Sequence, residues 1–220
     1  MPASEPSQAD AYYRTRFAPQ PGRDAAWRVI CRHLQRHLPA SPVVLDLGAG
    51  YCSFINQIDA AEKHALDAFE GFAAHAAAGV HTHVGSCADL SRFSTGQFTV
   101  VFASNLLEHL TRDELAAALA EARRVLRPGG RLVLIQPNFR YCAREYFDDY
   151  THRLVFSHVS LADLLASRGF AIDVVQPRFL PLSFKSRLPP WPWLVALYLR
   201  LPVKPFGKQM LVVATRPADR

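Results

Sequence analysis

The chain has 220 residues, of which 50% are hydrophobic and 20% charged, so it is long enough to bury one sizeable core. Its net charge of +6 permits an anionic partner, but no run of lysine or arginine concentrates that charge, and we expect no nucleic-acid partner. Four scattered cysteines without zinc spacing, and an N-terminus without the apolar core of a signal peptide, argue against a small secreted disulfide protein and favour a cytoplasmic protein with reduced thiols.

The N-terminal part of the chain is a polar start followed by a helical pattern. Residues 1–21 end in prolines and predict a flexible segment. The stretch "RDAAWRVICRHLQRHL", residues 23–38, places apolar side chains at helical spacing, and Pro39 ends the pattern. We expect this helix to open a single domain that covers residues 22–217.

Apolar runs of strand length then alternate with helical patterns. Strands are predicted over residues 42–48, 63–68, 81–85, 98–105, 130–137, 171–176 and 209–215. Helices are predicted over residues 53–58, 69–77, 112–126 and 160–169. This alternation indicates an α/β fold, a mostly parallel, doubly wound sheet with helices on both faces.

The helix over residues 112–126 has the clearest boundaries. Thr111 precedes it and Glu114 stands three residues later, which is the spacing of a capping box. The sequence "RPGG" at residues 127–130 marks the end of the helix.

An aromatic and proline-rich insert occupies residues 180–207. Its apolar stretch "PPWPWLVALYLRLP", residues 189–202, is too short for a bilayer and is interrupted by prolines and Arg200. One interpretation is a helix that packs on the domain's own core or on a second subunit. The other is peripheral contact with the inner membrane face, because Trp191 and Trp193 close to basic residues are typical of interfacial segments.

The loop after the first strand, in "VVLDLGAGYC", carries the first functional signal. Gly48 and Gly50 let the backbone turn sharply and approach a ligand at the carboxyl edge of the sheet. A dinucleotide site needs a third glycine shortly after Gly50, but this chain has Tyr51, Cys52 and Ser53 there. Asp46 before the glycines would repel a pyrophosphate and attract an ammonium or sulfonium group. An ordinary strand-to-helix turn is the structural alternative.

A second acid supports the ligand interpretation. Asp67 ends the next predicted strand, about 20 residues on, where a carboxylate accepts hydrogen bonds from ribose hydroxyls. Two acids and two glycines at this spacing together indicate a nucleotide with a cationic part.

Five segments carry a family resemblance: "VVLDLGAG", "ALDAF", "VGSCADLSRF", "VVFASNLLEHL" and "EARRVLRPGGRLVLIQPN". In this order they resemble the motifs of the Rossmann-like class I S-adenosylmethionine-dependent methyltransferases, over residues 40–180. The resemblance implies a methyltransferase with S-adenosyl-L-methionine as cofactor. It also implies a seven-stranded sheet whose last strand, residues 209–215, is antiparallel.

The resemblance also implies a set of cofactor-binding residues. The methionine part would be held by Asp46, Gly48 and Gly50, and the ribose by Asp67. The adenine would be contacted by Ser86 and Cys87, and the sulfonium would be faced by Ser104 and Asn105. In many relatives an acid follows the third strand and bonds the adenine amino group, but here those positions read Gly85, Ser86 and Cys87. Asp89, two residues later, would be the substitute adenine contact. Cys52 replaces the third glycine, and we interpret it as a packing residue and not a nucleophile.

Methyl transfer to oxygen or nitrogen needs a base near the donor. In "EYFDDYTHRLVFSH" we expect His152 to be that base, oriented by Asp149 or Asp148. His109 in "LLEHL" is a second candidate, unless it and Glu108 only cap the following helix. A metal site built from Asp148, Asp149 and His152 is a less favoured alternative, because nothing in the spacing sets a ligand geometry, and we predict no metal site.

The acceptor depends on the segments that the motifs do not cover. "THRLVFSHVSLADLLASRGF" resembles the tail of methyltransferases encoded alongside glycan and lipid biosynthesis enzymes, which favours a small-molecule acceptor, a sugar- or lipid-linked intermediate. Three alternatives stay open: a non-catalytic binding protein with the cofactor fold, an NAD-dependent oxidoreductase and an RNA methyltransferase. The sequence leaves the oligomeric state open.

Overall fold

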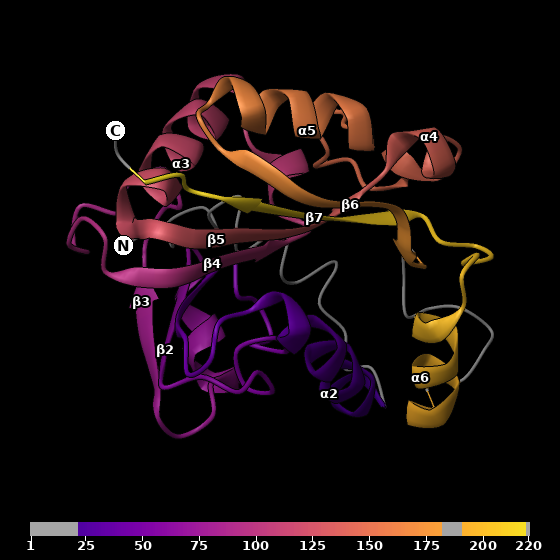
Figure 1. The fold of residues 1–220 in the computed structure, drawn as a ribbon, viewed down its shortest axis with the longest axis horizontal. Helices are drawn as coiled ribbons and strands as arrows, with labels where there is room; N and C mark the ends of the chain where they lie inside the picture. Colours follow the sequence, from indigo (N-terminus) through magenta and orange to yellow (C-terminus); the bar gives the residue numbers. More distant parts are fainter. Residues whose placement is uncertain (1–21, 182–190, 219–220) are drawn as a thin grey trace, which may run out of the picture.

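A computed structural model describes residues 22–181 and 191–218, so the predicted flexible start at residues 1–21 and part of the insert lie outside the described residues. Within these ranges seven strands form one sheet, shown in Figure 1. The strands are β1 (Val43–Leu47), β2 (Glu62–Asp67), β3 (Val80–Val84), β4 (Phe98–Ser104), β5 (Leu126–Pro137), β6 (Ala171–Leu180) and β7 (Gln209–Thr215).

Helices of two kinds connect the strands in the described ranges. The α-helices are α2 (Arg23–Leu34), α3 (Arg112–Val125), α4 (Phe139–Cys142), α5 (His158–Ser167) and α6 (Pro192–Arg200). Short 3₁₀ helices are η1 (Gln35–His37), η2 (Glu70–His75), η3 (Leu107–His109) and η4 (Tyr146–Asp148).

The sheet is doubly wound, with the strand order β3-β2-β1-β4-β5-β7-β6. β1 pairs in parallel with β2 and β4, whereas β7 is antiparallel to β5 and β6. The predicted sheet, mostly parallel with its last strand reversed, is confirmed. Chain order reverses between β1 and β4, and ligands of such sheets bind at the carboxyl ends of the strands beside this point.

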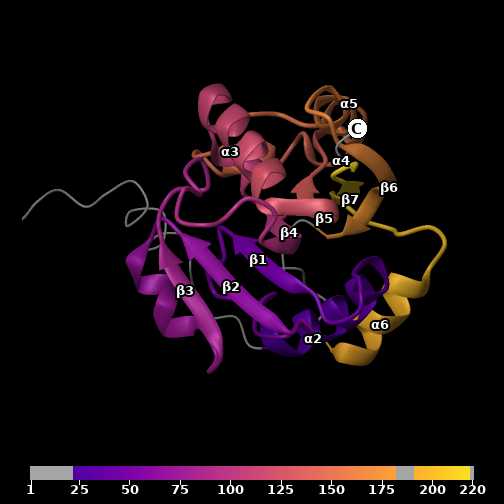
Figure 2. The same ribbon diagram turned by 60° about the vertical axis from the view of Figure 1, so that its left-hand side comes forward.

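Helices cover both faces of the sheet, as predicted. In Figures 1 and 2, α3 and α5 lie on one face and α2 and α6 on the other. β5 serves both sides, since Leu132 and Leu134 join the cluster with α3 and α5, whereas Val133 and Ile135 join the cluster with α2 and α6. Successive side chains of a strand point to opposite faces, so a strand covered on both sides is apolar throughout.

The predicted capping box of α3 is present. The Thr111 hydroxyl accepts a hydrogen bond from the Glu114 amide at 3.2 Å, and the Glu114 carboxylate accepts one from the Thr111 amide at 2.7 Å. The helix ends at Val125 and β5 begins immediately at Leu126, before the predicted strand start, because Leu126 pairs with Phe98 of β4.

Two helix predictions are wrong in kind. Residues 53–58 form turns, because the amides of Gln57 and Ile58 both donate to the Phe54 carbonyl and no regular ladder continues. Residues 69–77 form the 3₁₀ helix η2 instead of an α-helix. Gly71 inside it lowers the α-helical preference of the segment.

The helix of the insert, α6, has a buried and an exposed side. Leu199 is buried in the cluster that contains α2, and α6 contacts α2 directly. Trp191 and Trp193 stack with ring centroids 5.8 Å apart, and Trp193 is 62% exposed. Of the helices in the described ranges, α6 included, none is long and apolar enough to cross a membrane.

Candidate functional site

The glycine loop follows β1 at the switch point of the sheet. Gly48 and Gly50 adopt φ angles of +65° and +52°, in the left-handed region that glycine tolerates best. A Cβ atom at Gly48 would lie 2.9 Å from the Leu106 side chain, so the close approach of the segment after β4 also requires glycine there. The loop is therefore bent and held against the end of β4.

Asp67 fastens this loop to the end of β2. One of its carboxylate oxygens accepts a hydrogen bond from the Gly50 amide and the other from the Phe69 amide, both at 2.9 Å. Its side chain is buried, and the Gly48 amide donates to the Leu66 carbonyl at 2.8 Å. The two acids predicted to serve one ligand thus lie on adjacent strands at the same loop.

Asp46 is buried behind the loop. Burial, with the neighbouring charge of Asp67 as the second cause, raises the pKa of Asp46 well above its usual value. A cationic group placed between the loop and the strands would therefore stabilise the ionised form of Asp46.

Cys52 is fully buried at the position of the missing glycine. Its φ of +55° is the left-handed conformation that glycine would adopt without strain. Burial, then the charges of Asp46 and Asp67, raises the pKa of the Cys52 thiol to about 12. A thiol in this state is a poor nucleophile, which agrees with the prediction of a packing residue.

The predicted adenine contacts follow β3. Ser86 is exposed, and its hydroxyl accepts a hydrogen bond from the Ala88 amide at 3.1 Å. Cys87 is buried, and burial raises its pKa to about 11. Asp89 is exposed and accepts a hydrogen bond from the Ser91 amide.

Ser104 is the last residue of β4, beside the glycine loop, and Asn105 follows it. Asn105 has a φ of +51°, and its amide donates to the Ser104 hydroxyl at 3.1 Å. The Gln209 amide of β7 donates to the Asn105 side-chain oxygen at 2.6 Å. No local pattern in the sequence indicates Gln209, because it lies 104 positions from Asn105.

The predicted catalytic histidines lie together. The rings of His109, at the end of η3, and His152 are 4.9 Å apart between centroids. Asp149 is connected to His109 through Thr151: the Thr151 hydroxyl donates to the Asp149 carboxylate at 2.6 Å and is 2.9 Å from Nδ1 of His109. Burial, then the nearby His152, lowers the pKa of His109 to about 4.

Glu108 completes this cluster, although its place in the sequence does not indicate a site residue. Its side chain is fully buried, and burial raises its pKa to about 8. Neither carboxylate oxygen has a hydrogen-bond partner among the described residues. The capping alternative for Glu108 and His109 is wrong, because Thr111 caps α3.

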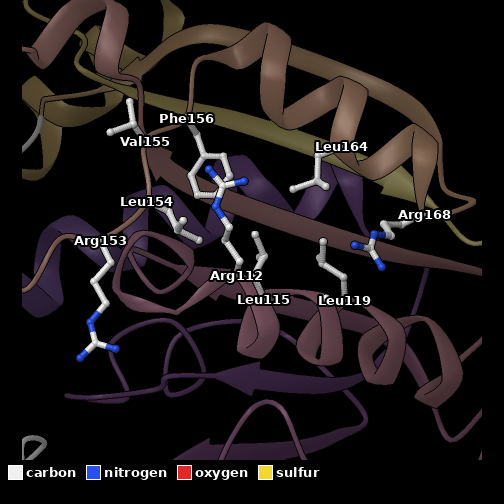
Figure 3. Close-up of a pocket in the computed structure, with 10 residues that line it drawn as sticks. Arg112, Leu115, Leu119, Arg153, Leu154, Val155, Phe156, Leu164 and Arg168 are labelled. Atoms are coloured by element: carbon white, nitrogen blue, oxygen red, sulfur yellow. The ribbon is translucent and has the colours of Figure 1, made fainter.

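A groove of about 430 Å³ lies between α3 and α5. Figure 3 shows Leu115 and Leu119 of α3 facing Leu164 and Phe156, with Arg112 and Arg168 beside them and Arg153 pointing away. The backbone amide of Arg153 donates to the Glu108 carbonyl at 2.7 Å, so the groove begins next to the histidine cluster.

Comparison with known proteins finds a family model and a relative that each match part of this chain. Residues 45–134 match the family model of a methyltransferase domain. An uncharacterized 37.1 kDa protein in transposon TN4556 of Streptomyces fradiae is 36% identical over 94 residues, covering 37% of this chain and 27% of that protein. The chain therefore spans about a quarter of the length of that curated relative.

Solved structures share the fold. A protein of Haloferax volcanii described as a methyltransferase, in complex with the Trm112 methyltransferase activator, has a TM-score of 0.66 at 17% identity and covers 90% of this chain and 92% of its own. A SAM-dependent methyltransferase of Thermotoga maritima has a TM-score of 0.65 at 20% identity, over 94% of each chain. At this identity the likeness is one of fold.

Proposed function

We propose that this chain, which carries a methyltransferase domain of the class I Rossmann-like type with S-adenosylmethionine as its cofactor, transfers the donor's methyl group to a sugar- or lipid-linked small molecule. The observation that carries the proposal is the pair of buried acids, Asp46 and Asp67, at a glycine loop on the switch point of the sheet. This loop suits a ligand with a cationic amino-acid part better than a pyrophosphate.

Donor binding is assigned to the loop and the neighbouring strand ends. Asp46, Gly48 and Gly50 would hold the methionine part, and Asp67 would accept hydrogen bonds from the ribose. The second group of contacts, to the adenine and the sulfonium face, would come from Ser86, Cys87, Ser104 and Asn105. The support is their common position at the carboxyl ends of β1 to β4, where such sheets bind ligands.

When bound, S-adenosylmethionine supplies a methyl group on a sulfonium for in-line displacement. The protein's task is then to align the acceptor and to receive its proton. His109 and His152 lie 4.9 Å apart beside the end of β4, and the hydroxyl of Thr151 ties Asp149 to His109. We propose that the nucleophilic atom of the acceptor lies beside this cluster, so that one of the two imidazoles can receive its proton.

The surface beside the histidine cluster supports the proposed class of acceptor. The groove between α3 and α5 combines an apolar floor of leucines with Arg112 and Arg168, which suits an acceptor with an apolar part and an anionic group. The exposed tryptophans of α6 and the net charge of +6 favour peripheral contact with an anionic membrane, where lipid-linked acceptors reside.

Calorimetry and mass spectrometry test the proposal. S-adenosylmethionine should bind to the purified chain and NAD should not. Incubation with a membrane-containing cell extract should convert one compound into a product about 14 Da heavier, the net gain of any methyl transfer. NAD binding in place of the donor would overturn the proposal in favour of an oxidoreductase, and donor binding without any methylated product would favour a non-catalytic binding protein.

A further inference from the structure

We propose that Glu108, His109 and His152 bind one divalent transition-metal ion, and that this ion holds an oxygen of the acceptor beside the methyl donor. The second part rests on the proposed function, whereas the first part stands on the cluster alone. One potential ligand atom from each of the three residues lies within 4.8 Å of the other two.

Glu108 supplies the first argument. Its side chain is fully buried, with both carboxylate oxygens unpartnered among the described residues. A buried carboxylate is tolerated where it is hydrogen-bonded, paired with a cation or bound to a metal, because otherwise it loses the hydration that stabilises its charge. The two imidazoles beside it are the side chains that most often bind metals together with a carboxylate.

The hydrogen bonds of His109 supply the second argument. The Thr151 hydroxyl has a single proton and donates it to Asp149 at 2.6 Å, so it accepts from Nδ1 of His109 at 2.9 Å. That bond places the ring proton on Nδ1 and the lone pair on Nε2. A metal-bound histidine is commonly fixed in this way, by an outer carboxylate that sets its tautomer and orientation.

The ligand set predicts the type of ion. One carboxylate and two imidazoles suit Zn²⁺, Mn²⁺, Fe²⁺ or Co²⁺ better than Mg²⁺ or Ca²⁺, which prefer oxygen ligands alone. Three protein ligands leave coordination positions for an exogenous oxygen. An acceptor hydroxyl at such a position would lose its proton to water more easily, and the electron pair left on its oxygen would form the new bond to the methyl carbon. The S–CH3 bond of the donor breaks in the same step, and its electron pair stays on the sulfur of the departing S-adenosylhomocysteine.

A second group in the described ranges, Glu62, His64 and His81, has similar spacing but lacks the unpartnered acid. Both ring nitrogens of His64 are already engaged, one with Glu62 at 2.8 Å and the other with His83 at 3.0 Å. This group lies on β2 and β3, away from the glycine loop, and it provides a matched control.

Metal binding to the full chain tests the inference. The protein is stripped with EDTA, dialysed and titrated with Co²⁺ by calorimetry and by absorption, with Mn²⁺ as a second probe. We expect one equivalent to bind to the parent and equally to His81→Asn. Glu108→Gln and His152→Ala should each weaken binding at least about ten-fold, since each removes a ligand.

A positioning variant separates ligand geometry from general stability. Thr151→Val keeps the side-chain volume but breaks the connection to Asp149, and it should weaken Co²⁺ binding about ten-fold, with rescue by Thr151→Ser. Without metal, Glu108→Gln should melt at the same temperature as the parent or higher, because it removes a buried acid.

Three results would overturn the inference: parent-like Co²⁺ affinity in Glu108→Gln, parent-like affinity in both His152→Ala and Thr151→Val, or no binding to the folded parent. Donor affinity is measured by calorimetry on the same samples. If the parent protein binds Co²⁺ but not the methyl donor, the proposed function is refuted and the metal site is supported.

Discussion

Asp67 is the residue to which the proposed donor site assigns the ribose contact, and it also holds the glycine loop. Replacing it with alanine removes the acceptor of two loop amides and the proposed ribose contact, so Asp67→Ala should weaken S-adenosylmethionine binding about ten-fold or more in calorimetry. Asp163→Ala, an exposed acid on α5, is the matched control and should bind normally. Parent-like affinity of Asp67→Ala would refute the ribose assignment.

The four cysteines should be unreactive in the folded protein. All are buried, and burial raises the pKa of Cys52 to about 12 and of Cys87 and Cys142 to about 11, so almost no thiolate exists at pH 8. Ellman's reagent should react rapidly only after unfolding, and then with four thiols. A fast equivalent in the native protein would point to a functional thiol.

At the scale of the element, α3 begins shortly after η3, which ends at His109 of the histidine cluster. Its capping box satisfies two amides at the helix start, so Thr111→Ala should lower the free energy of unfolding by about 1 kcal/mol in urea titrations. Thr95→Ala, in an exposed loop, should leave it nearly unchanged. Equal losses in the two variants would contradict the role of the cap.

The strands were easier to predict than the short helices. β7 was predicted with its observed bounds because a run of apolar residues bounded by polar ones is read locally. Residues 53–58 also have an apolar pattern, yet they form turns around the Phe54 carbonyl. Segments this short are shaped by packing, since Phe54 and Ile55 are buried, more than by intrinsic preference.

At the scale of the whole molecule, the exposed rings of Trp191 and Trp193 lie at the start of α6, away from the sheet. We expect the protein to sediment with anionic liposomes and Trp193→Glu to reduce that binding several-fold, because the change removes an exposed ring and adds a negative charge. Val159→Glu, on α5 across the sheet, adds the same charge and serves as control. Absence of liposome binding by the parent would end the membrane proposal.

The site could be predicted in part for the same reason as the fold. Spacing predicts that Gly48, Gly50 and Asp67 lie together, because the glycines follow a strand directly and the acid ends the next strand, and the structure brings them to one loop. His109 and His152 were named as separate candidates, and their proximity became visible only in the structure. The structure connects Asp149 to His109 through Thr151, and the orientation of His152 by Asp149 or Asp148 stays a prediction.

The sequence by itself determined the number and places of the strands, although not every strand end, together with the start of α3 and the glycine loop, because periodicity, capping and left-handed turns are set by residues a few positions apart. The tertiary structure alone decided that Glu108 is buried without a partner beside His109 and His152, and that Gln209 reaches Asn105. Burial and contacts across such separations depend on how the elements pack around the sheet, and no local pattern records that arrangement.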